Sequence, residues 1–139
     1  MTSDATPPAE PETSPAMRIG EVAARTGLSL RSLRHWDEVG LLRPSGRTDG
    51  GYRLYTETDV EKILVIRRMK PLGFSLEEMS AAMRDLETLH QPAGDGAAAA
   101  TAHERLTQIL RDAHERRATL VRQLAMADEF IELLNQQLS

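Results

Sequence analysis

Apolar residues recur at helical spacing along much of the chain, and the longest such pattern lies toward its C-terminal end. Ten positions that step alternately by four and three residues hold Leu106, Leu110, Ala113, Arg117, Leu120, Leu124, Ala127, Ile131, Leu134 and Leu138. Nine of the ten are apolar, which is the heptad pattern of a coiled-coil seam with Arg117 as the exception. The pattern predicts a helix from His103 to Leu138, about 54 Å long. A partner helix is the natural way to bury its stripe.

The segment from residue 17 to residue 42 predicts two short helices joined by a turn. Ile19 and Val22 stand at helical spacing in the first helix, and Gly27 interrupts it. Ser29 carries a side chain suited to cap the start of the second helix. Two short helices joined by a turn that contains glycine form a helix-turn-helix pattern.

The second of these helices has two different faces. An apolar stripe, which we expect to be buried, consists of Leu30, Leu33 and Trp36. A basic face carries Arg31, Arg34 and His35. A basic face on an isolated helix is usually just solvated. Here the helix is the second of a helix-turn-helix, which is the helix that enters the major groove of DNA in such motifs.

The helical pattern stops after Gly40, and residues 41–55 read "LLRPSGRTDGGYRLY". The glycines and the alternation around Leu54 predict a small hairpin, or wing. Its basic side chains are Arg43, Arg47 and Arg53. Of Tyr52 and Tyr55, we expect one ring to pack on the core with its hydroxyl at the surface. An outward hydroxyl and the guanidinium of Arg53 suit phosphate oxygens, which position a protein without reading sequence.

Two further helices follow the hairpin. Each begins with a candidate capping box, formed by Thr56 with Asp59 and by Ser75 with Glu78. The stretch "QPAGDGAAAA" then interrupts the pattern. We therefore expect four segments, namely a disordered tail over 1–16, a DNA-binding domain over 17–89, a linker over 90–102 and a dimerisation helix over 103–139.

Charge is unevenly distributed along the chain. Residues 17–74 carry 11 basic and 7 acidic side chains, whereas residues 75–139 carry 6 basic and 11 acidic ones, and the tail adds three acids. A basic block inside a chain of net charge −4 indicates a polyanionic partner at one place only.

Several function classes find no support in the residues. The chain has no cysteine, which excludes disulfides and thiolate metal sites, and its four histidines have no zinc-like spacing. No phosphate-binding loop, nucleophile elbow or paired-carboxylate site occurs, so we expect neither an enzyme nor a cofactor. No apolar run approaches the ~18 residues of a membrane span, and residues 1–16 lack the apolar core of a secretory signal. We expect a cytoplasmic protein.

Residues 17–79 resemble the DNA-binding domain of the MerR family of bacterial transcription regulators. The resemblance rests on "IGEVA", on "LRHWDEVGLL" in place of the commoner arginine–tyrosine–tyrosine run, on "GGYRLY" and on "LGFSLEEM". The long C-terminal helix matches the family's dimerisation helix as a pattern. The resemblance implies a mainly α fold, in which a winged helix-turn-helix domain is followed by a long antiparallel coiled-coil helix.

The same resemblance implies a function and its partners. A homodimer would bind a palindromic promoter element in double-stranded DNA and distort an overlong spacer, so that RNA polymerase engages both promoter elements. An architectural, excisionase-like DNA-bending protein without a switching role is the alternative. Metal-sensing members carry cysteines at the end of the coiled coil and drug-binding members carry a further C-terminal domain, whereas this chain lacks cysteine and ends at Ser139. The resemblance therefore implies no particular effector.

Two sets of residues are expected to carry this function. The DNA-contacting set is Arg18, Ser29, Arg31, Arg34, His35, Arg43, Arg47, Tyr52, Arg53 and Tyr55. The dimerisation set is Leu106, Leu110, Ala113, Leu120, Leu124, Ala127, Ile131, Leu134 and Leu138.

Overall fold

The computed structural model describes residues 16–91 and 96–139, and its contacts divide the chain into two compact units. The first unit runs to Arg68, and the second runs from Met69 to Ser139. The predicted tail lies outside the described residues except for Ala16.

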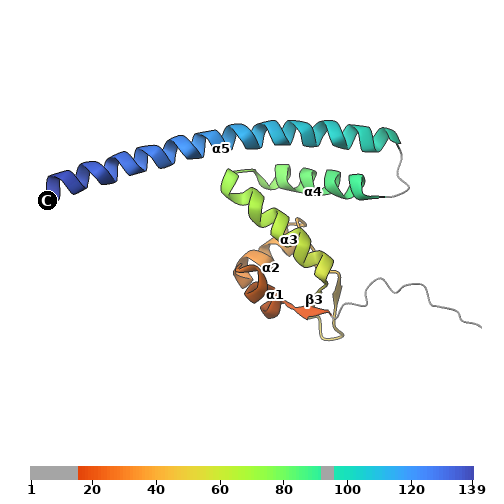
Figure 1. The fold of residues 1–139 in the computed structure, drawn as a ribbon. Coiled ribbons are helices and arrows are strands. Elements are labelled where there is room, and N and C mark those ends of the chain that lie inside the picture. The colour runs from red at the N-terminus through yellow and green to blue at the C-terminus, as the bar shows by residue number, and fades with distance from the viewer. Residues whose placement is uncertain (1–15, 92–95) are drawn as a thin grey trace, which may run out of the picture. The chain divides into compact units, whose positions relative to one another are not determined.

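The first unit contains the predicted helix-turn-helix and hairpin (Figure 1). Its elements are β1 (Met17–Arg18), α1 (Ile19–Thr26), α2 (Leu30–Glu38), β2 (Gly46–Arg47), β3 (Arg53–Tyr55) and α3 (Glu57–Met69). Gly27 ends α1 in the left-handed conformation, with φ of +73°, which a residue with a Cβ adopts only with strain. The side chain of Ser29 accepts a hydrogen bond from the Ser32 amide at 3.0 Å and so caps α2. Both roles were predicted.

A three-stranded antiparallel sheet joins the start of the unit to the hairpin. The strand order is β1-β3-β2, in which Met17 pairs with Tyr55 and Arg47 pairs with Arg53. The hairpin was predicted, but β1 was not. A two-residue strand is too short to show alternation, and it forms only because β3 offers it an edge.

The core of the first unit draws on all three helices and on β3. Its buried apolar side chains include Val22, Leu33, Trp36, Tyr55, Val60, Ile63 and Ile66. The predicted stripe of α2 is correct for Leu33 and Trp36. It is wrong for Leu30, whose side chain stays 38% exposed at the first position of the helix.

The second unit consists of a short 3-10 helix and two long helices. These are η1 (Lys70–Leu72), α4 (Leu76–His90) and α5 (Gly96–Leu138). Both predicted capping boxes are present in the chain. Ser75 and Glu78 exchange hydrogen bonds of 2.8 and 3.1 Å at the start of α4, and Thr56 and Asp59 do so at 3.0 and 3.2 Å at the start of α3.

Helices α4 and α5 run side by side in opposite directions (Figure 1). Arg105 of α5 forms two hydrogen bonds, of 2.8 and 3.0 Å, to the buried carboxylate of Asp85. Further toward the C-terminus of α5, the Arg116 guanidinium lies 4.2 Å from the centre of the Phe74 ring and 3.4 Å from the Glu78 carboxylate. The partner residues on α4 have lower numbers as the residue numbers on α5 increase, which is the antiparallel arrangement.

The final helix begins earlier than the sequence pattern predicted. It starts at Gly96 rather than at His103, so only residues 91–95 separate it from α4. Alanine has the highest helix propensity, and residues 97–100 are all alanine. Ala102, which was assigned to the linker, is fully buried. Among the described residues, no helix is both long and apolar enough to cross a membrane.

Along α5, the burial separates the predicted seam into two parts. Near α4, Leu106 and Ala113 are half-buried within this chain, whereas Leu110 is 56% exposed and Ile109 is half-buried instead. From Arg117 to the end of the helix every residue is exposed. Leu106 and Ala113 of the seam therefore pack partly inside the chain, whereas Leu110 and the stripe beyond Arg117 lie uncovered.

Candidate nucleic-acid interface

The basic face of α2 is presented by a helix that its apolar residues hold in place. Leu33 and Trp36 are buried, which fixes the rotation of the helix about its axis. The three side chains predicted to contact DNA on this helix, Arg31, Arg34 and His35, are all exposed. Their guanidinium and imidazole groups can therefore reach an approaching phosphate or base edge.

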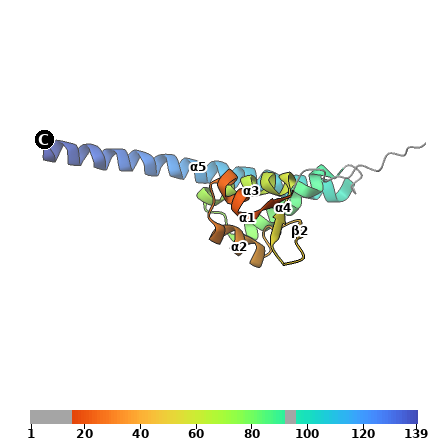
Figure 2. The same cartoon turned by 90° about the horizontal axis from the view of Figure 1, so that it is seen from below.

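The hairpin is attached to the end of α2 by one carboxylate, that of Asp37 (Figure 2 shows the two elements next to each other). Its Oδ2 atom accepts hydrogen bonds from Arg47 Nη2 and from Arg53 Nε, both at 2.7 Å. The carboxylate is nearly buried. Burial disfavours its ionised form, but the bonds and charges of Arg53 and Arg47 outweigh burial and hold the pKa of Asp37 below its ordinary value.

This arrangement changes what Arg47 and Arg53 do. From the sequence, both were expected to contact DNA from the wing, with phosphate contact assigned to Arg53 alone, and Asp37 was not singled out. In the structure, Arg53 is largely buried and its Nε is committed to Asp37, while Arg47 also donates to the Gly51 carbonyl at 3.3 Å. An acid on a helix and two arginines on a later hairpin show no sequence spacing that links them. Only the fold reveals the contact.

Tyr55 is fully buried, so the prediction that it contacts DNA is wrong. Residues 53 and 55 alternate with 54 along β3, and the side that carries Tyr55 turns toward the core. The prediction that its hydroxyl reaches the surface is also wrong. Within the described part of the chain that hydroxyl has no hydrogen-bond partner, and burial raises the pKa of Tyr55.

Tyr52 is the exposed tyrosine of the hairpin. Its side chain is 61% exposed, and the Arg18 guanidinium lies 4.6 Å from the centre of its ring. The turn beside it is closed by hydrogen bonds between Thr48 and Tyr52 and between Gly51 and Thr48. Gly51 has φ of +88°, which favours glycine. Arg18 and Tyr52 thus form an exposed pair, and Arg43 is exposed as well.

Asp59 anchors the base of the hairpin. Its Oδ2 atom accepts hydrogen bonds from the Ser45 amide at 3.1 Å, from the Ser45 hydroxyl at 2.6 Å and from the Thr56 amide. The residue is buried, and it was predicted only as part of a capping box. It therefore both starts α3 and fixes the point where the hairpin leaves the core.

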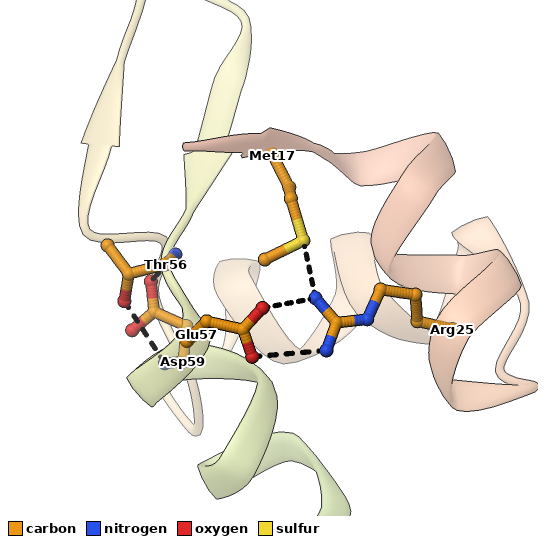
Figure 3. Close-up of polar contacts among 5 residues, drawn as sticks. All are labelled: Met17, Arg25, Thr56, Glu57 and Asp59. Carbon is orange, nitrogen blue, oxygen red and sulfur yellow. Dashed lines mark hydrogen bonds and ion pairs between the residues drawn. The ribbon is translucent and has the colours of Figure 1, made fainter. Parts of the chain in front are cut away.

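A second polar cluster holds the other end of the sheet (Figure 3). Arg25 of α1 forms two hydrogen bonds to the Glu57 carboxylate, of 2.5 and 3.0 Å, and its Nη1 lies 3.1 Å from the Met17 sulfur. This pair links α1 and β1 to the first turn of α3. Because both charged side chains are about half exposed, solvent weakens the attraction and the pair mainly orients the elements.

Within residues 16–91 and 96–139, no cluster of three or more histidine or acidic side chains could hold a metal ion. What the geometry presents is a basic helix face and a basic hairpin, tied together through Asp37.

Comparisons with known proteins agree with this geometry. The family model described as "MerR HTH family regulatory protein" matches residues 17–86. The transcriptional regulator HmrR of Rhizobium leguminosarum bv. viciae is 36% identical over 107 residues, which are 75% of this chain and 81% of HmrR. The nodulation protein NolA of Bradyrhizobium elkanii is 46% identical over 72 residues, which are 52% of this chain but only 33% of NolA.

A solved structure shares the fold. HiNmlR, a MerR-family regulator that lacks the sensor domain and is bound to promoter DNA, has a TM-score of 0.60 and 24% identity. The similarity covers 89% of this chain and 88% of that one. The family model spans half of the chain and HmrR aligns over most of its own length, so the similarity is not confined to one short motif. The chain belongs to the MerR family of helix-turn-helix regulatory proteins.

Proposed function

We propose that this chain is a sequence-specific DNA-binding transcription regulator that binds a palindromic promoter element as a homodimer and distorts the spacer between the promoter elements. The observation that carries the proposal is the exposed basic face of α2, with Arg31, Arg34 and His35, beside a basic hairpin. Family membership and the promoter DNA bound by HiNmlR support it. A regulator of this kind works in the cytoplasm without catalysis, and it acts on RNA polymerase through the promoter.

The roles of two arginines can be separated. Arg34 lies on the basic face of α2 and is proposed to read base edges, whereas Arg43 lies outside the helix and is proposed to contact phosphate. Affinity would be measured across a panel of operators with single-base changes. Arg34→Ala should lose preference at particular bases by about 1–3 kcal/mol, and Arg43→Ala should weaken all operators about equally. The reverse pattern would contradict this assignment of roles.

Salt dependence tests the electrostatic part of the proposal. A dimer that makes several phosphate contacts releases counterions on binding, so its affinity should fall by orders of magnitude between about 50 and 200 mM salt. The operator itself would come from a genome-wide binding map. One strong palindromic site supports a regulator, and many weak sites with no shared palindrome favour an architectural DNA-bending protein. An affinity that does not change with salt would contradict the proposed phosphate contacts.

Dimerisation is proposed to occur through the uncovered part of α5. Leu120, Leu124, Ile131 and Leu134 are between 40% and 62% exposed in the single chain, at the spacing of a coiled-coil seam. An apolar stripe of this length in water is unfavourable at about 25 cal/mol per Å², and a second copy running antiparallel would cover it. Arg117 is exposed near the start of the stripe, where pairing with an acid of the second copy would help to fix the register.

A pair of substitutions tests the seam in the full chain. Leu124→Glu places a charge on the proposed seam, and Thr119→Glu places the same charge on an exposed position of α5 beside it. Sedimentation should show a monomer for Leu124→Glu and a dimer for Thr119→Glu. Footprinting should show that only the Thr119→Glu control still protects both halves of the palindrome. A monomer of Leu124→Glu binds each half-site without the effective concentration that a linked second copy supplies. A dimeric Leu124→Glu protein would rule out this seam.

A further inference from the structure

One oxygen atom, Oδ2 of Asp37, holds both strands of the hairpin. Arg47 comes from β2 and Arg53 comes from β3, and the two residues are directly opposite each other in the sheet. Like charges at directly opposed positions of an antiparallel pair repel and destabilise it. A shared carboxylate between them turns the repulsion into two ion pairs. The pairing of β2 with β3 therefore depends on a residue of α2.

The position of Asp37 is not explained by the helix that carries it. The residue stands next to the last residue of α2, and an acid near a helix C-terminus interacts unfavourably with the helix dipole. The neighbouring Glu38 is exposed, while the Asp37 carboxylate is only 9% exposed. Burying a charge near an unfavourable helix end is costly unless partners compensate it, and here the partners are the two hairpin arginines.

We propose that Asp37 is a positioning residue that holds the hairpin against α2, so that both elements meet DNA as one preformed surface. This inference rests on the proposed DNA-binding function. The exposed groups it would align are Arg31 and Arg34 on the helix with Tyr52 on the hairpin. A surface that is already ordered loses less freedom on binding, which is the reason that preorganisation raises affinity.

Bulk electrostatics makes the opposite prediction, which gives the inference a sharp test. Neutralising an acid on a basic domain raises its net charge and should strengthen its attraction to DNA. If Asp37 acted only as a charge, Asp37→Asn would bind DNA more tightly, and Arg47 and Arg53 would become available to phosphate. If Asp37 positions the hairpin, the same substitution weakens binding despite the added positive charge.

The experiment compares Asp37→Asn with Glu38→Gln in the full chain. Both variants remove one negative charge from adjacent positions of α2, but only the first removes the hairpin contacts. Affinity for the operator would be measured over a series of salt concentrations. Glu38→Gln should bind as tightly as the parent or somewhat more tightly, and Asp37→Asn should bind about tenfold more weakly. Equal or tighter binding by Asp37→Asn would overturn the inference.

Hydrogen exchange separates positioning from a general loss of structure. The hairpin amides of Thr48 and Gly51 are hydrogen-bonded within the turn, and they should exchange faster in Asp37→Asn. Amides in the buried part of α3 should keep the protection that they have in the parent. Unchanged hairpin protection would also overturn the inference, and this readout needs no DNA. It therefore decides the matter even if the parent chain binds no DNA and the proposed function fails.

A second variant covers the case in which Asp37→Asn does not fold. Arg47 is 47% exposed, so Arg47→Gln breaks the same link at a side chain on which the core depends less. Arg47→Gln should speed the hydrogen exchange of the hairpin amides as Asp37→Asn does. If the Thr48 and Gly51 amides stay protected in Arg47→Gln, the positioning role is refuted. When both variants fold, the double variant Asp37→Asn/Arg47→Gln completes a double-mutant cycle. Its loss of affinity should be clearly smaller than the sum of the two single losses, because both substitutions break the same contact.

Discussion

Removing the hydroxyl of Tyr55 should stabilise the first unit, although this tyrosine lies in a stretch that resembles a DNA-contacting hairpin. The side chain is fully buried, and its hydroxyl has no hydrogen-bond partner among the described residues. A buried polar group left unpaired costs about 1–3 kcal/mol. Tyr55→Phe removes that cost and leaves a void of only one atom, so the free energy of unfolding should rise by about 1 kcal/mol.

Urea denaturation followed by circular dichroism measures this effect directly. The midpoint should rise with no change in the slope, because the surface exposed on unfolding stays the same. Tyr52→Phe is the matched control: its ring is 61% exposed, so its unfolding free energy should stay within about 0.5 kcal/mol of the parent. Operator affinity should be unaltered by Tyr55→Phe. A loss of stability in Tyr55→Phe would mean that the hydroxyl has a partner, such as a buried water, and would refute the reasoning.

The pH dependence gives an independent check on Tyr55. Burial raises its pKa above the ordinary value of 10.0, so the folded chain holds the phenol proton more tightly than the unfolded chain does. Below pH 10 the phenol keeps its proton in both states, and as the pH rises from 10 through the raised pKa the folded chain loses stability because the unfolded chain releases the proton first. Tyr55→Phe should lack this alkaline loss, and the gap between variant and parent should widen above pH 10.

Three further outcomes are expected. The lowered pKa of Asp37 means that the ionised carboxylate stabilises the fold above pH 3.8, the ordinary pKa, and that this stabilisation is lost as the pH falls through the lowered pKa. Asp37→Asn should lack that loss in acid denaturation, and an acid profile identical to the parent's would contradict the prediction. Arg105→Ala should lower the thermal midpoint more than Arg111→Ala does, because only the first leaves the buried carboxylate of Asp85 unpaired; equal midpoints would show that water replaces Arg105. Ser75→Ala should cost about 1 kcal/mol of unfolding free energy through loss of the capping box, and a neutral result in urea denaturation would show that the cap contributes little.

Local signals in the sequence predicted most of the secondary structure. Gly27, Ser29 and the two capping boxes are each satisfied by atoms within a few residues, so they act alike in any tertiary setting. Helical periodicity found the helices because burial of one face imposes it. The start of α5 was misplaced because a glycine-containing stretch was weighed above the alanines that follow it, and those alanines favour helix strongly.

Periodicity specifies that a stripe is buried, but it does not say what covers it. Leu106 and Ala113 belong to the same heptad pattern as Leu124 and Ile131, yet the first two are half-buried beside α4 in this chain and the last two are exposed. Helix α4 causes this difference, because it runs antiparallel to the first part of α5 only. The sequence pattern is the same for a helix partner from the same chain and for one from a second copy.

The chemistry of the hairpin was decided by tertiary structure alone. The sequence by itself determined that arginines and tyrosines gather between residues 43 and 55, because that is a matter of composition. The fold decided that Tyr55 turns inward and that Arg47 and Arg53 meet at Asp37, which stands 10 and 16 residues away. A non-local ion pair depends on where two elements come to lie, and neither residue's neighbours in the chain carry that information. The core buries one face of β3, and that burial separates the side chains left to meet a partner from those that hold the hairpin in place.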